Sequence, residues 1–119
     1  MPASILVVDD NRDAADLMGE ALRMVGYTVR VAHEPTEALA MLDDFTPDAA
    51  LLDIGLPGID GYTLAGELHR RLPALPLIAI TGYGQANDRA RAVAAGFAAH
   101  FVKPASIHDL VAVLERLLA

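Results

Sequence analysis

Five polar side chains follow apolar runs of the sequence, and their types suit cation and phosphoryl chemistry. Asp9 and Asp10 follow the first run, Asp53 the third, Thr81 the fourth and Lys103 the last. Lys103 is the only lysine among nine basic residues. A lysine provides a compact point charge where arginine provides a planar fork, so the two are not interchangeable at a tight anionic site.

Clustered carboxylates need a counter-charge. Two of them ~4 Å apart repel by ~4 kcal/mol at an effective dielectric constant of ~20, so a cluster either takes up protons or binds a cation. Oxygen ligands in a chain without cysteine favour a hard ion such as Mg²⁺. A lysine and a hydroxyl beside that ion could neutralise a transferring phosphoryl group while a carboxylate acts as the nucleophile. Taken singly, each residue has a structural interpretation too, such as an acid at a helix N-terminus or an aspartate in a turn.

The elements that must position these residues alternate between two patterns. Short apolar runs predict strands at Ser4–Val8, Thr28–Ala32, Ala49–Leu52, Leu77–Ile80 and Ala99–Val102. Helical spacing predicts helices at about 12–25, 35–45, 62–72 and 87–95, and a fifth that begins after Ser106. This alternation predicts an α/β fold with a parallel sheet. The polar residues above would then share the carboxyl edge of that sheet, where ligands bind in such folds.

Composition narrows the class of protein. The chain has 119 residues, a formal net charge of -7 and 54% hydrophobic residues, which favours a single domain over residues 1–119 with no output domain. The acidic balance argues against a nucleic-acid partner. No apolar stretch approaches the ~18 residues of a membrane span, and no signal peptide precedes the first strand, so we expect a cytoplasmic domain without membrane contact.

Four segments in order resemble the receiver domain of bacterial two-component response regulators. They are Ile5–Asn11, Leu51–Gly61, Ile80–Gly82 and Phe101–Pro104. The resemblance covers essentially the whole chain. It implies a doubly wound, flavodoxin-like fold with five parallel strands in the order 2-1-3-4-5 and five helices. It also implies a signalling domain rather than an enzyme.

The resemblance assigns roles to the acidic residues. Asp53 would accept a phosphoryl group from a phosphohistidine on a sensor histidine kinase or a phosphotransfer protein. Asp10, Asp53 and the backbone carbonyl of Gly55 would bind Mg²⁺, with Asp9 supporting the ion through water. Lys103 would contact the phosphoryl oxygens. The absence of a G-x-x-x-x-G-K-[ST] loop agrees with a phosphoryl donor other than a nucleotide bound in this site.

The same resemblance implies a switch. Thr81 would move to meet the new phosphoryl oxygens and pull loop 82–85, which Gly82 makes compliant. His100 takes the position that a tyrosine or phenylalanine usually occupies, and its smaller ring can change charge near neutral pH. The peptide bond before Pro104 is expected to be cis. The fourth helix, the last strand and the last helix would form the partner surface, in a monomer or a weak dimer.

The sequence also leaves open functions of other classes. A receiver-like domain could bind partners without being phosphorylated. An aspartate-nucleophile phosphatase would need a D-x-D pattern where this chain has Asp9-Asp10-Asn11-Arg12, and a flavin-binding protein would need a hydroxyl-rich loop there. Residues 81–85, 96–97 and 100–104 further resemble the receivers of hybrid sensor kinases.

Overall fold

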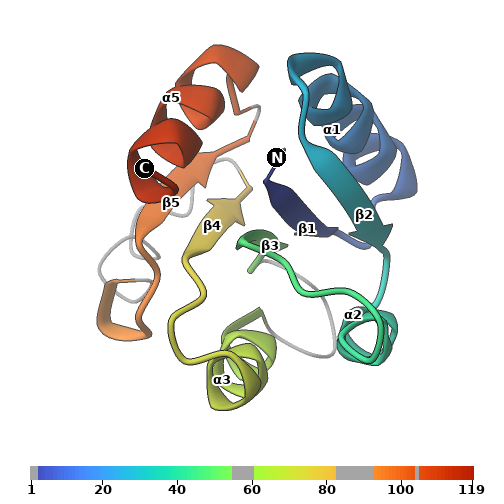
Figure 1. Ribbon diagram of the computed structural model, residues 1–119, viewed down its shortest axis with the longest axis vertical. Helices are drawn as coiled ribbons and strands as arrows, with labels where there is room; N and C mark the ends of the chain where they lie inside the picture. Colours follow the sequence, from blue (N-terminus) through green and yellow to red (C-terminus); the bar gives the residue numbers. More distant parts are fainter. Residues whose placement is uncertain (1–2, 55–60, 83–92, 104) are drawn as a thin grey trace.

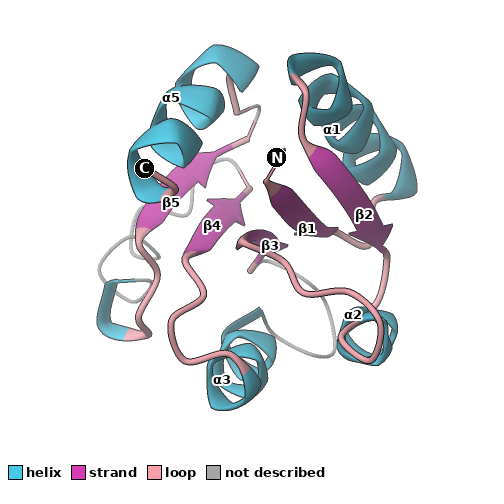
Figure 2. Cartoon of the chain, viewed as in Figure 1, coloured by secondary structure: helices cyan, strands magenta, loops and turns pink. Residues whose placement is uncertain are grey.

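The protein forms a five-stranded parallel sheet. The computed structural model describes residues 3–54, 61–82, 93–103 and 105–119. All neighbouring strands are parallel, in the order β2-β1-β3-β4-β5, which confirms the predicted topology (Figure 2). The strands are β1 (Ser4–Val8), β2 (Thr28–Ala32), β3 (Ala49–Asp53), β4 (Leu77–Thr81) and β5 (Ala99–Val102).

Helices cover both faces of the sheet. Within the described residues they are α1 (Arg12–Val25), α2 (Pro35–Met41), α3 (Gly61–Arg71) and α5 (Ile107–Leu117). Figure 1 shows α1 and α5 on one side of the sheet and α2 and α3 on the other. The helix predicted at 87–95 falls mostly outside the described residues. No helix in the part of the chain that the structure describes is long and apolar enough to span a bilayer.

Double coverage explains why the strands are apolar without alternation. Successive residues of β1 point to opposite faces, yet both sets are buried: Leu6 and Val8 pack on the side of α2 and α3, and Ile5 and Val7 on the side of α1 and α5. Each fully buried side chain of this size contributes ~1.5–3 kcal/mol. The two hydrophobic clusters therefore hold the sheet rigidly beneath the site at its edge.

Helix α2 is shorter than predicted. The apolar spacing suggested a helix to Phe45, but α2 ends at Met41. The next amides bond three residues back: Leu42 N–H donates to Leu39 O at 3.2 Å. This tightens the chain into turns. Phe45 is still buried, so its side chain joins the core from the segment that follows the helix. The Arg30 guanidinium lies 5.0 Å from the centroid of the Phe45 ring.

Candidate functional site

Polar residues from separate parts of the chain meet at the carboxyl edge of the sheet. Asp9 and Asp10 follow β1, Asp53 ends β3, Thr81 ends β4 and Lys103 follows β5. The parallel topology brings these strand ends together, and Lys103 N–H donates to Thr81 O at 2.8 Å.

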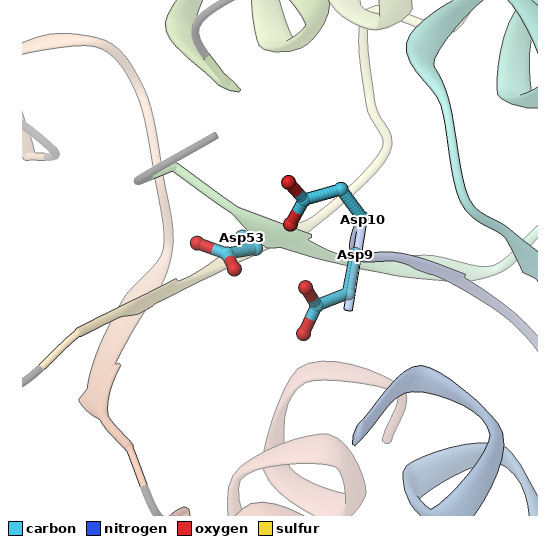
Figure 3. A group of neighbouring side chains, drawn as sticks. All are labelled: Asp9, Asp10 and Asp53. Carbon is cyan, nitrogen blue, oxygen red and sulfur yellow. The ribbon is translucent and has the colours of Figure 1, made fainter. Parts of the chain in front are cut away.

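The three carboxylates form a compact cluster. One oxygen from each of Asp9, Asp10 and Asp53 lies within 4.8 Å of the others, and Figure 3 shows the three side chains around a common space. Asp9 and Asp53 are 7% and 8% exposed, whereas Asp10 is exposed to solvent. Two of the acids are therefore held below the surface and the third lies at the mouth of the site.

Lys103 bridges the two buried acids. Its Nζ donates to Oδ2 of Asp53 at 2.7 Å and to Oδ2 of Asp9 at 2.9 Å. Charge-assisted hydrogen bonds of this length are among the strong ones in proteins. The ammonium thus neutralises part of the acidic cluster and lies directly beside the Asp53 carboxylate.

The pKa values at this site move in the directions that burial and pairing require. Burial raises the pKa of the Asp9 carboxyl and the neighbouring Asp53 adds to the rise, while hydrogen bonds from Lys103 and the Asn11 amide oppose it. Burial lowers the pKa of the Lys103 ammonium, but its hydrogen bonds to Asp53 and Asp9 outweigh burial and leave that pKa raised. Lys103 is therefore charged at neutral pH, and the environment disfavours the charged form of Asp9.

Local structure fixes the acids at the β1 end. The side-chain oxygen of Asn11 caps α1 by accepting a hydrogen bond from Ala14 N–H at 3.1 Å. The backbone N–H of Asn11 donates to Asp9 Oδ1 at 3.0 Å. Asp9 N–H in turn donates to Ala32 O at 3.1 Å. Asn11 thus begins the helix and orients a carboxylate of the cluster at once.

A glycine sets the position of α3 beside Asp53. A Cβ at Gly61 would lie 2.6 Å from Ile54 Cα and 3.0 Å from Asp53 O. Only glycine permits this approach without a backbone shift. The sequence places Gly61 in the segment that carries the family resemblance, but it does not reveal this contact.

Thr81 and His100 lie in direct contact on neighbouring strands. The Thr81 side chain is fully buried, and its Oγ1 lies 3.0 Å from His100 Nε2. Thr81 Oγ1 also donates to Phe101 O at 3.5 Å. The sequence indicates a role for each residue separately, but it does not predict the hydrogen bond between them.

Other expectations lie outside the described residues. They concern the Gly55 carbonyl, the bond before Pro104, residues 83–85 of the loop and most of the fourth helix. Gly82 is described and follows β4 directly.

An apolar cavity that sequence analysis did not predict adjoins the site. It has a volume of about 710 Å³ and lies between α1 and the start of α5. Leu17, Met18 and Ile107 line it, together with Asp53 and Lys103 of the site. Leu17 is 66% exposed, off the buried face of α1 that Ala15 and Leu22 form.

Comparison with known proteins agrees with this geometry. The family model described as "Response regulator receiver domain" matches residues 5–115. The chain belongs to this receiver family. Its strand order is the one that the resemblance of the four sequence segments implied.

Relatives and solved structures extend the match across the receiver. Response regulator MprA of Mycobacterium ulcerans is 34% identical over 118 residues, covering 99% of this chain and 51% of that protein. The receiver domain of NtrX from Brucella abortus has a TM-score of 0.89 at 36% identity, covering 96% of this chain and 97% of that one. A CheY-like receiver protein from Methanospirillum hungatei gives 0.90 at 30% identity, covering 99% and 94%. The chain spans about half the length of the curated relatives it matches.

Proposed function

We propose that this receiver accepts a phosphoryl group on Asp53 from a phosphohistidine of a sensor histidine kinase or phosphotransfer protein. The observation that carries the proposal is the joint hydrogen bonding of Lys103 to Asp53 and Asp9 beside a third carboxylate. A buried nucleophile next to a fixed ammonium suits attack on phosphorus, because the positive charge stabilises the phosphoryl oxygens. The domain would act in cytoplasmic signalling and not as an enzyme with a separate substrate.

The donor set fits Mg²⁺. All candidate ligands are oxygens, and three carboxylates share one small space with only one ammonium to balance them. Hard divalent cations prefer such ligands. Asp10, Asp53 and the Gly55 carbonyl would hold the ion, with Asp9 acting through water. When bound, Mg²⁺ would neutralise charge on the phosphoryl oxygens.

The transfer step exchanges one bond for another. An Asp53 oxygen forms a bond to phosphorus as the phosphorus–nitrogen bond of the donor phosphohistidine breaks, and the donor imidazole leaves and recovers a proton from solvent. Lys103 Nζ already lies 2.7 Å from Asp53 Oδ2, so the ammonium would need little movement to contact an oxygen of a phosphoryl group on Asp53. The Thr81 hydroxyl would donate a hydrogen bond to another phosphoryl oxygen.

The signal would leave through the neighbouring strands and helices. Movement of Thr81 would displace Gly82 and loop 82–85, with His100 responding behind it. The changed surface would comprise the fourth helix, β5 and α5, in a monomer or weak dimer. The finer resemblance to receivers of hybrid sensor kinases and the cis bond between Lys103 and Pro104 stay predictions.

Phosphorylation can be tested by intact mass after incubation with acetyl phosphate and Mg²⁺. We expect a single phosphoryl adduct that is stable in acid and labile in base. Asp53→Asn should abolish it, whereas Asp43→Asn, at an exposed aspartate in the turn after α2, should leave it unchanged. Omission of Mg²⁺ should suppress the adduct in the wild type and in Asp43→Asn.

Two results would favour the other classes of function. An unmodified mass in a sample that demonstrably binds Mg²⁺ would indicate a receiver-like binding module that is not phosphorylated. Steady hydrolysis of unrelated phosphate esters, lost in Asp53→Asn, would indicate a phosphatase.

A further inference from the structure

The contact between Thr81 and His100 follows from strand register. In the β4–β5 pair, Ala79 lies opposite His100 and Thr81 opposite Val102. Because side chains alternate along a strand, Thr81 and His100 point to the same face and are diagonal neighbours. Thr81 Oγ1 and His100 Nε2 are 3.0 Å apart, and the threonine is fully buried. The threonine side of this hydrogen bond is therefore shielded from competing water.

The hydroxyl of Thr81 has a single proton to donate. A hydroxyl donates once and accepts through two lone pairs. The contact with Phe101 O, at 3.5 Å, is at the limit of a hydrogen bond, so His100 is the nearer partner. Either the hydroxyl or the imidazole N–H donates across the Thr81–His100 contact, according to the tautomer of His100. In both cases a phosphoryl group on Asp53 that accepts a hydrogen bond from Thr81 would draw Oγ1 away from the imidazole.

We propose that His100 is a positioning residue that holds the Thr81 hydroxyl in the resting state and competes with the phosphoryl group for it. This inference rests on the proposed function, since it concerns the threonine of the same site. His100 then opposes the phosphorylated conformation, and its hydrogen bond sets how readily that conformation forms. An apolar ring at position 100 could fill the space but could not exert this hold.

The test uses the folded protein with Mg²⁺ and the unreactive phosphoryl mimic beryllofluoride. His100→Phe removes the competing nitrogen, so the mimic should bind about fivefold more tightly, the worth of roughly one net hydrogen bond. His100→Gln, which restores an amide donor and acceptor, should bind close to wild type. His108→Phe on α5, at an exposed histidine, is the matched control and should change nothing.

A double-mutant cycle separates this role from a packing effect. In a Thr81→Val background the hydroxyl is absent, so His100→Phe should no longer alter the affinity for the mimic. The imidazole ¹⁵N resonances of His100 should shift on addition of beryllofluoride in the wild type and stay fixed in Thr81→Val. If His100→Phe does not fold, His100→Met replaces it as the variant without a hydrogen-bonding nitrogen.

The outcomes distinguish the two proposals. If acetyl phosphate gives no adduct on Asp53 and the mimic does not bind, the proposed function fails. If the wild type is phosphorylated, but His100→Phe binds the mimic as the wild type does, the role of His100 is overturned. It is also overturned if the gain in affinity persists in Thr81→Val.

Discussion

Lys103 Nζ lies 2.7 Å from Asp53 Oδ2, and the same nitrogen donates to Asp9 at 2.9 Å. The only lysine of the chain thus holds two buried acids together. This arrangement has two consequences. It reduces repulsion in the resting site, and it keeps a positive charge beside the atom that we propose as the nucleophile.

Removal of the ammonium should destabilise the metal-free protein. Lys103→Met leaves buried carboxylates without their counter-charge, at an expected cost of about 1–2 kcal/mol, less than for a fully buried pair because the lysine is partly exposed. Urea denaturation with and without Mg²⁺ measures this, and Mg²⁺ should recover part of the loss. Arg116→Met, at an exposed position in α5, is the control. A loss of equal size in both conditions would contradict the electrostatic explanation.

Asp9 should contribute a pH-dependent penalty to stability. Burial raises the pKa of its carboxyl above 3.8, so the folded state holds a proton more tightly than the unfolded state. Protonation of Asp9 therefore increases the free energy of unfolding as the pH falls through the raised pKa, and this increase is complete below pH 3.8. Asp9→Asn should be more stable than wild type at pH 7 without metal, and this advantage should shrink on acidification.

Mg²⁺ affinity provides the second measurement on this variant. Calorimetric titration should give weaker Mg²⁺ binding for Asp9→Asn than for wild type, because one negative charge is lost from the cluster. A stability difference that stays constant from pH 7 to pH 4 would show that titration of Asp9 does not cause it.

Two glycines of α3 should respond in opposite directions to the same substitution. Gly61→Ala would place a Cβ 2.6 Å from Ile54 Cα, so we expect a loss of about 1–3 kcal/mol and a displaced Asp53. Gly66→Ala has no atom within 4 Å of the new Cβ and should gain about 0.5–1 kcal/mol. Thermal unfolding measures both. Similar effects at the two positions would contradict the close approach at Gly61.

The N-cap of α1 should contribute more to the stability of the protein than the N-cap of α5. Asn11→Ala removes a side chain that accepts from Ala14 N–H at 3.1 Å, and we expect a loss of about 1 kcal/mol. Ser106 accepts from Asp109 N–H at 3.4 Å, so Ser106→Ala should cost less. Asn11→Asp retains the cap and serves as the control. Equal losses for the two alanine variants in thermal unfolding would contradict this ranking.

The inner strands β1, β3 and β4 were predictable because both of their faces are buried. That burial produces continuous apolar runs whose polar end residues stand out, as Asp53 and Thr81 do. Contacts that depend on register were not predictable. The Thr81–His100 hydrogen bond requires Ala79 to pair with His100, and an apolar pattern does not specify that alignment.

The end of helix α2 and the close contact at Gly61 are two further features that the sequence pattern did not predict. Phe45 satisfies helical spacing yet enters the core from a turn, because periodicity records burial and not backbone conformation. Gly61 is needed because α3 packs closely on Ile54, and only the folded arrangement reveals the missing space.

The bridge between Lys103 and Asp9 joins residues 94 positions apart. While the ribosome is still making the second half of the chain, the acids of the early strands have no ammonium to balance them. The charge balance of this pocket is reached only after β5 has joined the sheet. A polypeptide that ends before Lys103 would therefore lack the cation on which we expect signalling to depend.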